Sequence, residues 1–196
     1  MPSQPREVRT AKQAEQEDLF FGQSVILWAR WSVIVAGIVL VLWTSKDVAL
    51  LSRTMPFFLV LMAVNFFLHG RYVMGSPLNR LVVTIASAVD LILITAIVVF
   101  WPGMPGLDNQ FFVLYFPVVF AFALVFTRKI EATYTALAIA AYAAACFVTA
   151  TVQTENDYKV LVMRAIVIAA LGFLGNYYFR IQRDRLARLS KSESAA

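Results

Sequence analysis

Six apolar stretches dominate this chain, and each is close to the length of a membrane-crossing helix. About 20 apolar residues in helical form span the hydrocarbon core of a bilayer. The chain is 60% hydrophobic and 15% charged, whereas soluble domains average about 45–50% and about 25%. The sequence therefore predicts an all-α polytopic membrane protein with six transmembrane helices. The stretches cover roughly residues 25–44, 55–73, 81–100, 110–127, 132–152 and 160–179.

Short connections and an uneven distribution of basic residues predict the topology. Neighbouring spans joined by short loops form antiparallel pairs, so three antiparallel hairpins are expected. If the N-terminus is cytoplasmic, 13 of the 17 Lys and Arg residues fall on the cytoplasmic side, Arg30 among them. Cytoplasmic loops carry such an excess. Both termini are therefore expected in the cytoplasm.

The segments that flank the spans divide the chain into three parts. Residues 1–24 mix basic and acidic side chains and lack the short apolar run and cleavage site of a signal peptide. We expect them to be a cytoplasmic segment that forms a surface helix. Residues 25–179 are the six-span bundle. Span six continues without Gly or Pro into residues 180–196, which are expected to form a cytoplasmic helical stem and a disordered tail.

Asp90 is a carboxylate in the middle of the third span. A charge at that depth costs a few kcal/mol or more unless it is paired, protonated or hydrated. Two interpretations stay open: a structural carboxylate that bonds to polar groups of the bundle, and a site for a ligand, an ion or a proton. Arg30 and Asn65 lie at suitable depths to be structural polar partners. No second buried acid is expected, so a proton pathway is not predicted.

The chain offers little for metal binding or catalysis. It has one cysteine, Cys146, and one histidine, His69, which excludes an internal disulfide and clusters of these ligands. His69 is a weak candidate ligand for haem or chlorophyll, and an interfacial histidine is more often solvated. No constellation of nucleophile, acid and base is evident, so the protein is not expected to be an enzyme. The basic residues flank spans, and no nucleic-acid module fits.

The connection between spans three and four carries the densest local signal. Gly and Pro between Trp101 and Pro117 predict a tight turn at the membrane surface. Asn109 can cap the fourth span. The turn combines backbone N–H donors, an amide and aromatic faces, which suit the head group of a quinone, although a plain interfacial turn fits the same residues. The candidate ligand-binding residues are Asp90, Asn109, Phe111 and Tyr115.

These features occur in an order that resembles a known family. An Arg-Trp pair opens the series at Arg30-Trp31, and Asn65 and the run Asp90 to Thr95 follow. The turn Pro105 to Phe111 comes next, with Pro and Gln at two positions where the family has Gly and Pro; Tyr115, Pro117 and Arg164 complete the series. Over residues 20–185 the chain resembles the six-span membrane sensor region of bacterial histidine kinases of the redox-responsive, quinone-sensing type.

The resemblance implies a function and a location. It implies a sensory module in the bacterial inner membrane that binds a quinone or another lipophilic ligand, forms a homodimer and signals through span six. The chain as given has no phosphoacceptor segment and no ATP-binding domain, so it is expected to be a sensor fragment or a stand-alone relative without a kinase. Two alternatives remain: an accessory or assembly subunit of a larger membrane complex that handles quinones or pigments, and a small transporter.

Small residues on spans five and six favour close packing within the bundle or at a dimer face.

Overall fold

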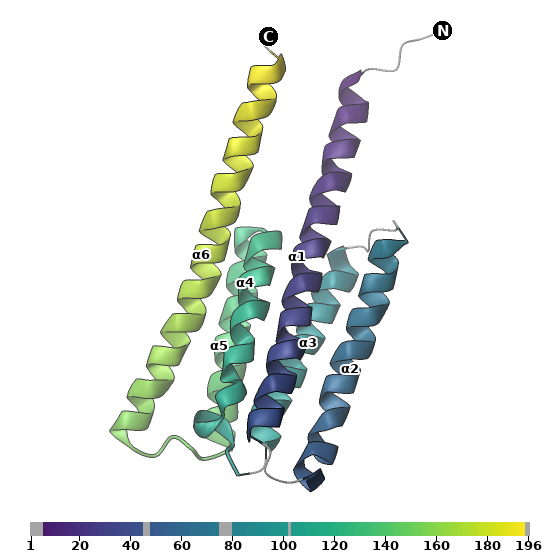
Figure 1. The fold of residues 1–196 in the computed structure, drawn as a ribbon. Coiled ribbons are helices and arrows are strands. Elements are labelled where there is room, and N and C mark those ends of the chain that lie inside the picture. Colours follow the sequence, from purple (N-terminus) through teal and green to yellow (C-terminus); the bar gives the residue numbers. More distant parts are fainter. Residues whose placement is uncertain (1–5, 45–47, 75–79, 102, 195–196) are drawn as a thin grey trace.

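The computed structural model describes residues 6–44, 48–74, 80–101 and 103–194, and side chains over a smaller part of these ranges. Six α-helices and two short 3-10 helices make up this part of the chain (Figure 1). The elements are α1 (Arg6–Thr44), α2 (Val48–Val73), α3 (Arg80–Phe100), η1 (Gly106–Asp108), η2 (Gln110–Leu114), α4 (Tyr115–Val125), α5 (Arg128–Val148) and α6 (Glu155–Ser194).

The helices confirm the predicted multi-pass membrane fold. Five stretches within the described helices are long and apolar enough to cross a bilayer. A sixth, Gln110–Val125, is apolar but shorter, because it joins η2 to α4. Large apolar side chains such as Trp43, Phe67 and Phe173 are exposed on the outer surface, where lipid takes the place of water. The protein is a helical bundle of three antiparallel hairpins.

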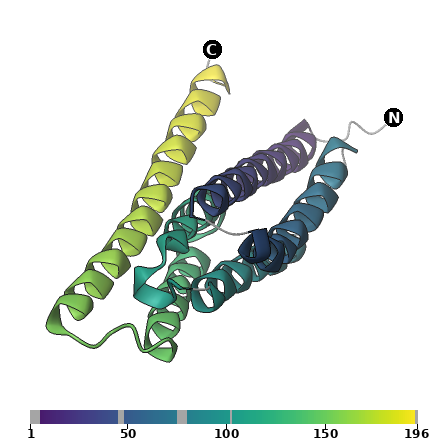
Figure 2. The ribbon, with the colours of Figure 1, turned by 60° about the horizontal axis from the view of Figure 1, so that its bottom comes forward.

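Helix α4 occupies the centre of the bundle. It packs against α1, α3, α5 and α6, while α2 packs on α1 and α3. Helices α2 and α6 therefore form opposite edges, as Figures 1 and 2 show. This placement explains why α4 is the most apolar helix and why Tyr115, Val119 and Ala123 are fully buried.

Two prolines lie at different places in their helices. Pro56 lies inside α2, which begins at Val48. Pro117 lies in the first turn of α4, directly after the 3-10 segment Gln110–Leu114. A proline in a first turn costs nothing in hydrogen bonding, since the amides there lack intrahelical acceptors. The irregular backbone therefore lies before Pro117 rather than at it.

The first and last helices extend far beyond the bundle at the same end (Figure 1). We call this end the terminal face and the other the opposite face. Helix α1 begins at Arg6, so residues 6–24 continue directly into the first span and are not a separate surface helix; residues 1–5 lie outside the described part. Helix α6 runs from Glu155 to Ser194 and includes most of the segment for which a disordered tail was expected.

Candidate functional site

Arg30 and Asp90 form a buried ion pair between α1 and α3. Nη2 of Arg30 lies 2.9 Å from Oδ1 of Asp90, and the side chains are 4% and 3% exposed. The negative charge of Asp90, for which the sequence alone gave no partner, is thus neutralised by Arg30 of the first span. Arg30, counted above among the cytoplasmic basic residues, lies within the bundle instead, which leaves 12 residues on that side. Removing one member of a buried pair strands the other charge and is strongly destabilising.

Other polar groups surround this pair. The Tyr134 hydroxyl of α5 donates to the backbone carbonyl of Ser87, 2.8 Å away and one turn from Asp90 on α3. Three helices, α1, α3 and α5, therefore meet at one polar level inside the membrane.

Asn65 of α2 lies at the same level. The Trp31 ring contacts the Phe66 ring edge-on with centroids 5.3 Å apart, which aligns α1 and α2 so that Arg30 and Asn65 are at one depth. Asn65 is fully buried, and neither its Oδ1 nor its Nδ2 has a hydrogen-bond partner within the described part of the chain. Nη1 of Arg30 is also buried and has no hydrogen-bond partner among the described residues.

The turn between α3 and α4 is held by Asn109, which was expected to cap the fourth span and which caps η2, just before α4. Its Oδ1 accepts from the Phe111 N–H at 2.7 Å. Its Nδ2 lies 3.4 Å and 3.3 Å from the carbonyl oxygens of Ile97 and Val98 at the end of α3. The amide therefore caps η2 and holds the turn onto α3, and its donors and acceptor are used inside the protein.

Phe111 and Tyr115 are likewise occupied by internal contacts. The Phe111 ring packs on Trp101 with centroids 4.3 Å apart. The Tyr115 hydroxyl shares a 2.7 Å hydrogen bond with Thr95, five residues beyond Asp90 on α3. The structure thus brings Asn109, Phe111 and Tyr115 together at the opposite face, and Asp90 lies about 7.5 Å deeper along α3 than Thr95, the partner of Tyr115. All four side chains are buried and none projects from the surface.

Arg164 links this turn to α6. Its Nη1 donates to the Leu107 carbonyl and to the Tyr142 hydroxyl, each at 2.7 Å. Its guanidinium carbon also lies 3.8 Å from the centroid of the Phe112 ring, a cation–π geometry. One side chain thus joins α6 to η1, η2 and α5. The sequence placed Arg164 near the start of span six but did not indicate these contacts.

Gly106 allows the turn to lie close to α5. Its φ is +60°, a conformation that favours glycine. A Cβ at this position would collide with the side chains of Thr149 and Thr151. Thr151 in turn accepts a hydrogen bond from the Leu107 N–H at 3.0 Å. The turn is therefore fixed on both sides, by Asn109 to α3 and by Thr151 to the connection that follows α5.

The structure also contains a second buried acid, which corrects the expectation that Asp90 is alone. Glu131, in the first turn of α5, is 6% exposed. Its Oε1 accepts from the Thr135 hydroxyl at 3.0 Å, and a Cβ added at Gly172 of α6 would collide with both side chains. The sequence shows that Glu131 and Thr135 are four residues apart, one helical turn, but not that Gly172 of another helix faces them.

His69 lies apart from these sites. It is exposed near the end of α2, and its ring centroid is 6.5 Å from that of Tyr72. Within the described ranges no group of three or more His, Cys, Asp or Glu side chains is placed to hold a metal ion.

No protein-family model matches the chain, and no significant match is found among curated proteins or solved structures.

Proposed function

We propose that this protein is a sensory or regulatory module of the bacterial inner membrane, with cytoplasmic termini and no catalytic activity of its own. The observation that carries the proposal is the position of Arg164. It ties the start of α6 to the turn at the opposite face. The same helix then continues without interruption to Ser194, beyond the terminal face. A change at the turn is therefore coupled to the protruding segment through one continuous helix.

Signalling requires a ligand that binds two packings of the bundle unequally. The Arg164 contacts are suited to this because they are few and directional. A molecule that competes for the guanidinium releases α6 from Leu107 and Tyr142. The rigid elements on either side, α5 and the capped η2, stay in place because Thr151 and Asn109 hold them independently.

We propose a quinone or a similar lipophilic carbonyl compound as the ligand. The Asn109 amide is already fully used, so Arg164 is the better donor for a quinone carbonyl. The Phe112 ring beside it is only partly buried and offers an apolar face to the quinone ring. The sequence suggested Asn109, Phe111 and Tyr115 as ligand-binding residues. We propose instead that the quinone contacts Arg164 and Phe112.

The proposal is tested by thermal unfolding in lipid nanodiscs with a short-chain ubiquinone analogue. A ligand that binds the folded state raises the melting temperature with its concentration. We expect this rise for the wild type and for Lys159→Gln, which removes an exposed charge on the same helix. We expect no rise for Arg164→Gln. A wild-type melting temperature that does not respond to the quinone contradicts the ligand, and an equal response of Arg164→Gln contradicts the site.

A further inference from the structure

The polar level inside the bundle holds more hydrogen-bonding capacity than the protein uses. Among the residues that the structure describes, no partner bonds the donor or the acceptor of the Asn65 side chain, or Nη1 of Arg30. Asp90 neutralises Arg30, so these groups do not call for an ion. In native proteins, buried polar groups without a protein partner are usually satisfied by ordered water.

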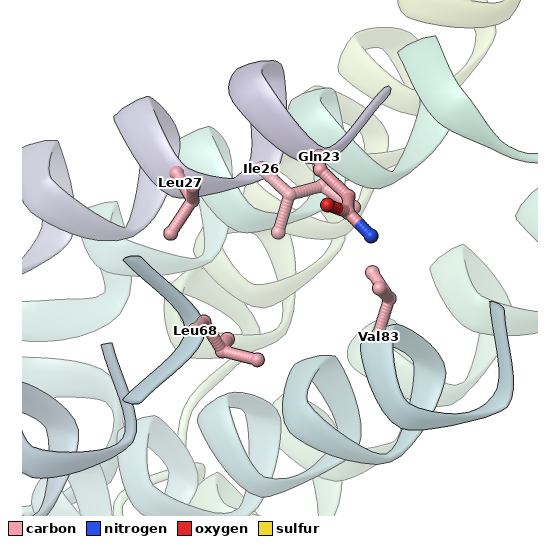
Figure 3. Close-up of a pocket in the computed structure, with 5 residues that line it drawn as sticks. All are labelled: Gln23, Ile26, Leu27, Leu68 and Val83. Carbon is pink, nitrogen blue, oxygen red and sulfur yellow. The ribbon is translucent and has the colours of Figure 1, made fainter. Parts of the chain in front are cut away.

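A small pocket lies one to two helical turns closer to the terminal face. Figure 3 shows side chains of α1, α2 and α3 around one shared space: Gln23, Ile26, Leu27, Leu68 and Val83. The space measures about 10 Å³, which is about what a single water molecule requires. Gln23 contributes an amide to an otherwise apolar lining.

The helical registers connect the pocket to the polar groups. Leu27 is three residues from Arg30, and Leu68 is three residues from Asn65. Residues three or four apart share one face of a helix. The pocket and the unpartnered groups are therefore successive levels of the same α1–α2–α3 interface. Val83 and Asp90, seven residues apart, occupy the same face of α3 in the same order.

We propose that an internal water site lies between Asn65 and the Arg30–Asp90 pair, and that the pocket admits water to it from the terminal face. Water fits because it donates and accepts at once. It accepts from Nδ2 of Asn65 or Nη1 of Arg30 and donates to Oδ1 of Asn65 or to the Asp90 carboxylate. Such a site makes about three hydrogen bonds, as buried waters typically do. It does not depend on the quinone or on Arg164.

The test is water-to-protein magnetisation transfer in solid-state NMR spectra of the protein in bilayers. The side-chain amide of Asn65 is expected to receive magnetisation from water early, at a rate near that of the exposed Asn156. Asn109 is the matched control, since it is equally buried but fully bonded inside the protein. Its amide is expected to receive magnetisation at least several-fold more slowly.

Two results of the magnetisation-transfer experiment overturn the proposal. If Asn65 receives magnetisation as slowly as Asn109, no water occupies the site. If Leu68→Phe, which fills the pocket, leaves the transfer rate at Asn65 unchanged, water does not enter by this route; a rate lowered at least twofold supports the route. Thermal unfolding of Asn65→Val gives a second readout. A lower melting temperature supports a bonded amide, whereas a higher one shows that the amide was unsatisfied and dry.

Discussion

At the scale of single residues, the Arg30–Asp90 pair determines how the first and third helices can pack. Both charges lie in segments that cross the membrane, where an unpaired charge is costly. The pair fixes the register of α1 against α3, because a shift by one residue on either helix separates the two side chains. The pair also stabilises the fold, because removal of either side chain leaves the other charge buried without a partner.

Asp90→Asn is therefore expected to lower the free energy of unfolding by about 3–5 kcal/mol, as does breaking other buried pairs. The double variant Arg30→Met with Asp90→Leu is expected to lose much less, because neither charge is left alone. Asp108→Asn, an exposed acid in the turn, serves as the control and should change little. Reversible unfolding by SDS in mixed micelles measures these differences. A single variant as stable as the wild type contradicts the role given to the pair.

At the scale of helices, small residues set how closely neighbouring elements approach. A Cβ at Gly37 of α1 would overlap the Phe58 ring of α2. Gly37→Ala is therefore expected to force α1 and α2 apart and to destabilise the protein by about 1–3 kcal/mol. Gly70→Ala is the control, because nothing lies within 4 Å of its added Cβ, and helix propensity makes it neutral or slightly stabilising. Equal effects of the two substitutions, measured by the same unfolding experiment, contradict the close contact.

The sequence predicted the helices well and the contacts between them poorly. Apolar length located every span to within a few residues, since the bilayer imposes that length. The cap at Asn109 was also predictable, because it depends on neighbours in sequence. The Arg30–Asp90 pair, the position of Arg164 and the burial of Glu131 were not predictable. Each depends on the register of two helices distant in sequence, which composition and periodicity do not specify.

At the scale of the whole molecule, α1 and α6 leave the bundle at one end (Figure 1). The distribution of basic residues predicts that this end faces the cytoplasm. In a Cys146→Ala background, Met104→Cys on the turn is expected to react with a membrane-impermeant maleimide added outside spheroplasts. Arg180→Cys on α6 is expected to react only after the membrane is opened. The reverse pattern contradicts the proposed orientation.

The most direct test of the coupling between the turn and α6 is a distance measurement across the bundle. Spin labels at Trp28→Cys on α1 and Arg180→Cys on α6, in the Cys146→Ala background, report the position of α6 by pulsed electron paramagnetic resonance in nanodiscs. We predict that a quinone shifts or broadens the distance distribution, and that Arg164→Gln alone produces a similar change that quinone does not extend. A distribution that stays the same after both the quinone and the substitution contradicts the claim that Arg164 couples the turn to α6.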